Sequence, residues 1–302
     1  NPETISIYGV NNKNFIVGEI EPNLLEGITA KNGFNTDFTH LLDVDDSLVN
    51  FNVAGKYKVT VYLTTDSSVF ATYTLYVRKP VEPGVYEGYY EKLDGLTGIE
   101  LNNELRDLIR NTGTSTGSTA QVQSVDRVGT SYYLIYDGMG SYGNREHVWP
   151  NSKLGSVKYD LHNLRAAKKT TNSARLNYPF ADNNKPFTGS QPYEKIGSTW
   201  YPGDKHIGDV ARIVFYISIR ENLSLNLVGN VDLFLEWHEL DPVDDFEINR
   251  NDNIFEIQNN RNPFIDHPEL AQIYFGNGTM STTLALLDLT FDMFSYNRNY
   301  AI

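Results

Sequence analysis

The chain has 302 residues and a formal net charge of −13, with 40% hydrophobic and 13% aromatic residues, including 20 tyrosines. This composition is typical of a folded protein with one large or two ordinary domains, and it excludes an intrinsically disordered chain. Cysteine is absent, which excludes disulfides and thiolate metal sites. No run of about 18 apolar residues predicts a membrane span. The chain carries no basic-then-apolar leader, so we expect a processed product.

Residues 1–79 are predicted to form a small all-β module. Alternation of polar and apolar residues predicts strands at 5–8, 15–17, 56–63 and 70–77. The phrase Ala-Gly-Lys-Tyr-Lys-Val-Thr-Val at 54–61 resembles the late strands of bacterial immunoglobulin-like surface domains. Such a fold fixes no function. We expect a spacer or attachment module, and binding to a glycan, a cell wall or DNA is the alternative.

Residues 80–84 are expected to be a linker, because two prolines and a glycine suit an extended connection. Residues 85–302 would then form a second domain. A helix is predicted from 98 or 99 to about 111, because its leucines and isoleucine recur on one face. The run of Gly, Thr and Ser at 113–119 predicts a flexible loop, and the Gly-Lys-Ser/Thr of a phosphate loop does not follow it.

The stretch 145–175 carries most of the chemistry. It opens with Arg-Glu-His-Val-Trp-Pro at 145–150, passes through Asp-Leu-His-Asn-Leu-Arg at 160–165 and ends with Asn-Ser-Ala-Arg at 172–175. Residues 160–165 are predicted to form a short strand and 166–175 a helix. The implied unit is strand, strand, helix.

Three side chains of this stretch match the needs of phosphodiester hydrolysis at neutral pH. His147 is a candidate general base, because imidazole titrates near neutrality. Glu146 and Asn172 offer oxygen ligands to a hard cation such as Mg²⁺, and two protein ligands leave positions for water and phosphate. Adjacent strand residues point to opposite faces. Glu146 and His147 can therefore converge only if the backbone leaves strand geometry, which we expect near Pro150.

Two segments of the C-terminal half admit alternatives. The apolar, β-branched run 210–219 fits either a buried strand or a helix. The acidic cluster 241–247 fits a second metal site or the start of a helix. The helix start is favoured, because acids suit the positive end of the helix dipole. A helix over 246–259 and a closing strand over 284–294 complete the predicted elements.

Several motifs, in order and approximate spacing, resemble the endonuclease I family of bacterial extracellular and periplasmic nucleases, which belongs to the ββα-metal or His-Me finger group. Beyond the stretch 145–175, the resemblance rests on Tyr89-Tyr90 with Gly95-Leu96-Thr97-Gly98, Gly208 to Arg212, and Gln258 to Phe264. It covers roughly 85–270. The expected fold is therefore α+β, with a ββα-metal nuclease domain preceded by an all-β immunoglobulin-like sandwich.

The resemblance implies a role for each candidate. His147 matches the family's general base, and Glu146 and Asn172 match its metal ligands for Mg²⁺, with Mn²⁺ or Ca²⁺ as substitutes. It implies a bacterial, secreted or cell-surface endonuclease that hydrolyses DNA and RNA to 5′-phosphate and 3′-hydroxyl ends. A noncatalytic cell-surface protein that binds nucleic acid or mediates adhesion on the same scaffold is the alternative.

Better-known family members contact the phosphate with an arginine from an insertion that this chain lacks. Arg145, Arg165 and Arg175 are the candidates for that contact here. Asp160 and His162 are expected to support the site through hydrogen bonds, and a plain core histidine is the alternative for His162.

The charge of the chain is distributed unevenly. Residues 141–221 hold 12 Lys or Arg against 7 Asp or Glu, whereas 238–302 hold 3 against 11. A cationic patch around the proposed site can therefore coexist with an acidic exterior. This distribution predicts weak nonspecific affinity for nucleic acid and strong inhibition by salt.

Overall fold

The computed structural model describes residues 3–80, 84–110, 117–154 and 158–276. The chain divides into two compact units, Asn1–Glu82 and Pro83–Ile302, and each is described by itself. The predicted strand at 284–294, most of the predicted loop at 113–119 and part of the expected linker lie outside the described residues.

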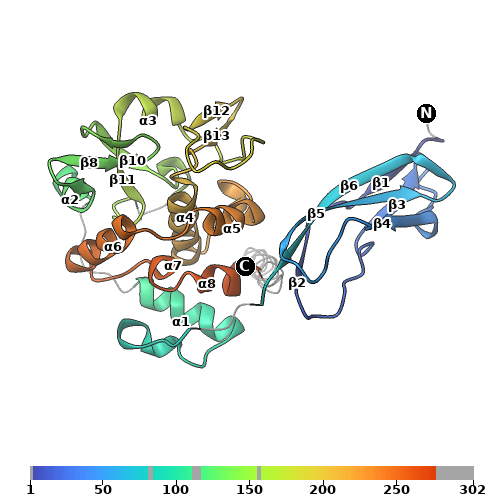
Figure 1. The fold of residues 1–302 in the computed structure, drawn as a ribbon, viewed down its shortest axis with the longest axis horizontal. Coiled ribbons are helices and arrows are strands. Elements are labelled where there is room, and N and C mark those ends of the chain that lie inside the picture. Colours follow the sequence, from blue (N-terminus) through green and yellow to red (C-terminus); the bar gives the residue numbers. More distant parts are fainter. Residues whose placement is uncertain (1–2, 81–83, 111–116, 155–157, 277–302) are drawn as a thin grey trace, which may run out of the picture. The chain divides into compact units, whose positions relative to one another are not determined.

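The first unit is built from strands (Figure 1). They are β1 (Ile5–Tyr8), β2 (Lys13–Ile16), β3 (Thr29–Asn32), β4 (Leu42–Asp45), β5 (Gly55–Leu63) and β6 (Asp66–Arg78). One sheet has the order β2-β6-β5-β4, with β5 and β6 as an antiparallel hairpin, and β1 pairs with β3 in a second sheet. The apolar residues of both sheets share one core, including Phe15, Ala30 and Val59. The four predicted strands are confirmed, with boundaries shifted by a few residues.

The second unit mixes helices with short strands, so the α+β class is confirmed. Its helices are α1 (Gly98–Arg110), α2 (Thr119–Val125), α3 (Lys169–Arg175), α4 (Ile207–Glu221), α5 (Val231–Leu240), α6 (Asp245–Gln258), α7 (Pro263–Asp266) and α8 (Glu269–Ala271). Its strands are β7 (Arg127–Val128), β8 (Ser131–Leu134), β9 (Gly138–Gly140), β10 (Asn144–His147), β11 (Leu164–Ala167), β12 (Glu194–Ile196) and β13 (Thr199–Tyr201). None of the described helices has the length and apolar character that a bilayer span requires.

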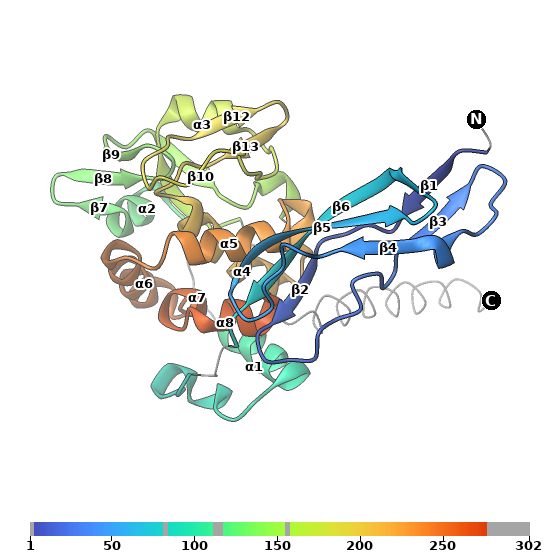
Figure 2. The same cartoon turned by 45° about the vertical axis from the view of Figure 1, so that its right-hand side comes forward.

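Helix α4 forms the centre of this unit, and every side chain from Ile207 to Ile219 is buried. Figures 1 and 2 both show α4 surrounded by other elements, among them α5 and α7. A helix enclosed on all sides is apolar on most of its surface, and the buried Asp209 and Arg212 of α4 are paired with Arg165 and Glu247. The run 210–219, which the sequence left open between strand and helix, is therefore helical.

Helix α6 begins with a capping box. The Asp244 side chain accepts a hydrogen bond from the Glu247 backbone N–H, and the Glu247 carboxylate accepts one from the Asp244 N–H. The acidic cluster 241–247 thus marks a helix start, as favoured from sequence.

Strands β10 and β11 pair antiparallel, and α3 follows β11 after one residue. Two boundaries differ from prediction. Residues 160–163 form a turn instead of the start of a strand, because the Asp160 side chain accepts the His162 N–H and the Asp160 carbonyl accepts the Leu164 N–H. The strand therefore begins at Leu164, and the helix begins at Lys169 instead of Ala166.

Candidate active site

Helix α3 packs against β10 through Asn172. The Asn172 Nδ2 lies 3.1 Å from Asn144 Oδ1 and 3.0 Å from the Arg145 carbonyl oxygen. A carbonyl oxygen only accepts hydrogen bonds, so the nitrogen of the amide must face β10. The Asn172 Oδ1 is therefore directed away from the Asn144 and Arg145 oxygens that Nδ2 bonds.

Glu146 lies on the same side of β10 as Asn144 and is buried, with 3% of its surface exposed. Its Oε1 accepts a hydrogen bond from the Tyr136 hydroxyl at 3.1 Å and lies 3.3 Å from Arg175 Nε. Arg175 is one turn beyond Asn172 on α3. The structure thus brings the two predicted metal ligands to one face of β10, under α3.

The environment of Glu146 suits a bound cation. Burial raises the pKa of Glu146 to about 7, although Arg175 and Tyr136 act to lower it. The carboxylate thus loses more hydration than its protein partners replace. Among the described residues, no three His, Cys, Asp or Glu side chains converge in a metal-binding cluster. A cation here would use Glu146, the Asn172 amide oxygen and water, which is the donor set Mg²⁺ favours.

His147 is half-buried at the end of β10, and its Nε2 lies 3.0 Å from the carbonyl oxygen of Lys158. Because that oxygen only accepts, Nε2 carries the proton and Nδ1 keeps its lone pair. Burial lowers the pKa of His147, which favours the neutral ring. His147 can therefore accept a proton at Nδ1.

A surface pocket of about 300 Å³ opens beside His147. It is lined by Thr119, Tyr142, Gly143, Asn144, Arg145 and His147. The Arg145 Nη1 donates to the Gly117 carbonyl, which holds the guanidinium at this pocket. A Cβ on Gly143 would lie 2.6 Å from the Lys169 backbone nitrogen, so this position requires glycine.

The expectation that the backbone departs from strand geometry at Glu146 and His147 is wrong. Both residues keep regular antiparallel pairing, with Glu146 opposite Arg165 and His147 opposite Leu164. Side chains therefore alternate along β10. Glu146 faces α3, whereas His147 and Arg145 line the pocket.

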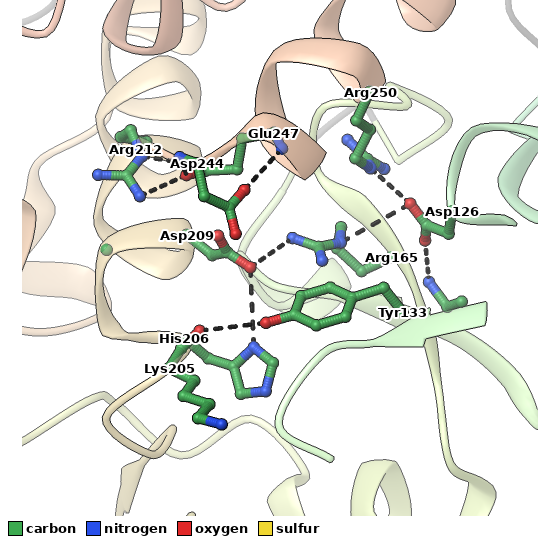
Figure 3. A network of polar contacts seen from close by, with 12 residues as sticks. Asp126, Tyr133, Arg165, Lys205, His206, Asp209, Arg212, Asp244, Glu247 and Arg250 are labelled. Atoms are coloured by element: carbon green, nitrogen blue, oxygen red, sulfur yellow. Dashed lines mark hydrogen bonds and ion pairs between the residues drawn. The ribbon is translucent and has the colours of Figure 1, made fainter. Parts of the chain in front are cut away.

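Two of the three candidate arginines are enclosed by the protein. Arg165 Nη1 lies 3.0 Å from Asp209 Oδ2 and its Nε 3.8 Å from Asp126 Oδ1, inside the polar network of Figure 3. Arg175 donates to the carbonyls of Val148 and Leu176 at 2.8 and 2.9 Å.

Arg165 is 1% exposed and Arg175 is fully buried. Their burial argues against a direct phosphate contact by either one. Of the three candidates, Arg145 is the one that lines the pocket.

Asp160 and His162 belong to the core. Asp160 accepts hydrogen bonds from the Tyr216 hydroxyl and Gln258 Nε2, both at 2.7 Å, and pairs with Arg220 at 2.9 Å. His162 is buried, with Nε2 3.2 Å from the Asn260 carbonyl oxygen. These contacts tie the turn 160–163 to α4 and to the segment after α6. The plain core histidine is therefore the description that fits His162.

Two residues near the candidate site were given no role from the sequence, although Asn163 lies within the motif 160–165. Tyr136 reaches Glu146 from the hairpin loop between β8 and β9. The fully buried Asn163 bonds the backbone of Trp149 twice, at 2.7 and 3.1 Å, and so fixes the segment that follows His147. Their partners lie 10 and 14 residues away, a separation at which no local pattern operates.

Comparison with known proteins identifies the family of the chain. The sequence model of the endonuclease I family matches residues 97–269, more than half of the chain. An extracellular ribonuclease of Bacillus subtilis (strain 168) is 35% identical over 222 residues, covering 61% of this chain and 76% of that protein. An extracellular ribonuclease of Bacillus amyloliquefaciens is 34% identical over 224 residues, covering 61% and 77%. A periplasmic deoxyribonuclease of Aeromonas hydrophila is 30% identical over 134 residues, covering 41% and 54%. The chain belongs to the endonuclease I family of nucleases.

Proposed function

We propose that the chain is a secreted, metal-dependent endonuclease in which His147 is the general base. The observation that carries the proposal is the state of His147. Its Nε2 lies 3.0 Å from the Lys158 carbonyl oxygen, and the residue lines a pocket that also contains Arg145. This ββα arrangement of β10, β11 and α3 is the one expected of a His-Me finger.

In this mechanism His147 takes the proton of the attacking water at Nδ1. The Lys158 carbonyl oxygen, 3.0 Å from Nε2, orients the ring and stabilises the imidazolium that forms. Arg145 binds a nonbridging phosphate oxygen from the pocket, in the bound substrate as well as in the pentavalent arrangement.

Glu146 and Asn172 would hold one Mg²⁺, for which Mn²⁺ or Ca²⁺ are possible substitutes. Asn144 lines the pocket and bonds Asn172, so the pocket reaches the Glu146 side of β10, where the ion would supply electrostatic stabilisation of the charge on the phosphate and on the departing 3′-oxygen. Arg145 contributes its backbone carbonyl, which fixes the Asn172 amide so that Oδ1 faces outward. Hydrolysis then leaves 5′-phosphate and 3′-hydroxyl ends.

The substrates are DNA and RNA. The relatives carry the names of ribonucleases and deoxyribonucleases, and the contacts proposed for Arg145 are to phosphate, which both nucleic acids share. Secretion is proposed because these relatives are named extracellular or periplasmic. The first unit is proposed to be an immunoglobulin-like attachment module, with contact to the cell surface or cell wall.

Replacement of the base tests the proposal. His147→Ala should lower the rate of plasmid and RNA degradation by about 10² or more, because general-base loss typically costs that much. EDTA should abolish the wild-type activity. The control is His40→Ala, an exposed histidine of the first unit. Wild-type turnover by His147→Ala would reject the assignment.

A further inference from the structure

Two backbone conformations near Glu146 are unusual. Among the described residues, every non-glycine residue with a left-handed φ is an asparagine except Tyr136, with φ 75°, and Leu176, with φ 54°. Asparagine enters this region readily, whereas a bulky side chain enters it only at a cost in free energy that the surroundings must offset. Such strain gathers at functional sites. Both residues adjoin the contacts of one carboxylate, that of Glu146.

Tyr136 sits in the three-residue hairpin loop between β8 and β9, where glycine or asparagine is usual. The Tyr136 side chain is directed inward and is 3% exposed, with its ring centroid 5.5 Å from that of Trp200. Its hydroxyl lies 3.1 Å from Glu146 Oε1. Tyr136 thus adopts an unfavourable φ, and its hydroxyl contacts Glu146, the candidate metal ligand.

Leu176 ends α3 and acts on the same carboxylate through Arg175. The Leu176 carbonyl accepts from Arg175 Nη1 at 2.9 Å, and the Val148 carbonyl accepts from Nη2 at 2.8 Å. The guanidinium is thereby fixed with Nε 3.3 Å from Glu146 Oε1. Tyr136 and Arg175 thus converge on one oxygen. In the described ranges the side-chain hydrogen bond and the ion pair of this carboxylate both fall on Oε1, and the His147 backbone N–H also bonds the carboxylate.

We propose that Tyr136 is a positioning residue which, together with Arg175, fixes Oε1 of Glu146 so that Oε2 is presented to the divalent ion. The inference rests on the proposed function, because it takes Glu146 as a metal ligand. Outer partners that orient a ligating carboxylate typically govern metal affinity by about 10- to 100-fold. A purely structural role for the hydroxyl would instead change stability and leave metal affinity unaltered.

The test measures Mn²⁺ binding to the full chain without nucleic acid, by the electron paramagnetic resonance signal of the free ion. Tyr136→Phe, which removes only the hydroxyl, should weaken Mn²⁺ binding by about 10- to 100-fold. The matched control is Tyr90→Phe, which removes another buried hydroxyl that donates to a carboxylate, Asp266 Oδ2 at 2.5 Å. This control should bind Mn²⁺ like the wild type. Thermal unfolding in EDTA compares the stability of both variants.

Glu146→Gln separates failure of this inference from failure of the proposed function. Loss of Mn²⁺ binding in Glu146→Gln with wild-type binding in Tyr136→Phe overturns the positioning role and leaves the metal site intact. Unchanged binding in Glu146→Gln overturns both.

A second route covers the case in which Tyr136→Phe does not fold. Glu146→Asp draws the carboxylate back by one methylene, away from the Tyr136 hydroxyl, and should weaken Mn²⁺ binding to a similar extent. Wild-type affinity in Glu146→Asp would also overturn the inference.

Discussion

At the scale of single residues, the surroundings of the three arginines separate their roles. Arg165 and Arg175 have carboxylate partners and are buried, so their charge is used inside the protein. Arg145 donates to the Gly117 carbonyl and lines the pocket with His147. A guanidinium held by a neutral acceptor keeps its charge available for a phosphate.

Removal of this arginine should weaken substrate binding more than catalysis of bound substrate. We expect Arg145→Ala to raise the KM for nucleic acid about tenfold or more, since hydrogen bonds to charged groups contribute about 1.5–3 kcal/mol. The slope of log KM against log salt should fall by about one, the change expected when one phosphate contact is lost. Steady-state kinetics at several salt concentrations measure both. Arg110→Ala, at an exposed arginine ending α1, is the control. An unchanged salt slope in Arg145→Ala would remove the phosphate contact.

The two proposed metal ligands, Glu146 and Asn172, should determine how much Mg²⁺ the enzyme requires. Glu146→Gln and Asn172→Ala should both raise the Mg²⁺ concentration needed for half-maximal activity, because each removes one protein ligand of a weakly held ion. Asn177→Ala, an exposed asparagine just beyond α3, should leave the Mg²⁺ titration unchanged. If the titration curves of both ligand variants overlay the wild type, neither residue binds the metal.

At the scale of elements, the turn 160–163 anchors the start of β11 to the core. His162 is buried there among Asn260, Tyr216 and Asp160, and burial lowers its pKa to about 4 from the usual 6.5. The folded state therefore favours the neutral ring. The unfolded chain takes up a proton below about pH 6.5, whereas the folded chain does so only near pH 4. This residue's contribution to stability is complete above pH 6.5 and is lost as the pH falls towards 4.

The loss should amount to about 3 kcal/mol of unfolding free energy by pH 4, at 1.36 kcal/mol for each unit of pKa shift. Urea unfolding at pH 7.5 and pH 4 measures it. In His162→Gln the difference between the two pH values should shrink by about that amount. Exposed His40→Gln is the control. An undiminished difference in His162→Gln would show that another group causes the acid sensitivity.

Some of the helices and strands can be predicted from the sequence and others cannot. Alternating patterns gave β5 and β6, and helical periodicity gave α1, because one periodic face of each is buried. The run 210–219 stayed open, because a segment buried on all sides has no periodicity to separate helix from strand. Regular pairing through His147 was not foreseen, because it depends on the long-range partner β11.

For the candidate site, the sequence motifs named Glu146, His147 and Asn172, which the fold places on β10 and on the adjoining α3. The motifs could not rank the arginines, since burial of Arg165 depends on Asp126 and Asp209, 39 and 44 positions away. Tyr136 was not identified because its contribution depends on a left-handed φ in a loop whose sequence carries no glycine at that position.

At the scale of the whole molecule, charge is distributed unevenly along the chain and the fold consists of two compact units. The stretch 141–221, which contains β10, β11 and α3, has a balance of 12 basic to 7 acidic residues, although the chain as a whole carries −13. Some of these basic side chains, Arg165 among them, pair with acidic side chains inside the protein, in the network around Asp209 (Figure 3). The field that attracts a polyanion is therefore modest, which fits the expectation of weak, salt-sensitive binding.

Each unit has a hydrophobic core of its own. The core of the first contains Phe15 and Val59, whereas that of the second is built around α4 and includes Trp149 and Trp237. A unit with its own core can fold independently. We therefore expect residues 83–302 alone to unfold cooperatively and to cleave a short oligonucleotide with kcat within about twofold of the full chain, because every residue of the proposed chemistry lies in the second unit. Circular dichroism and steady-state kinetics on the two proteins measure this. A fragment that folds with the same helix content but loses turnover would show that the first unit contributes to catalysis, whereas one that does not fold would show that the second core depends on the first unit.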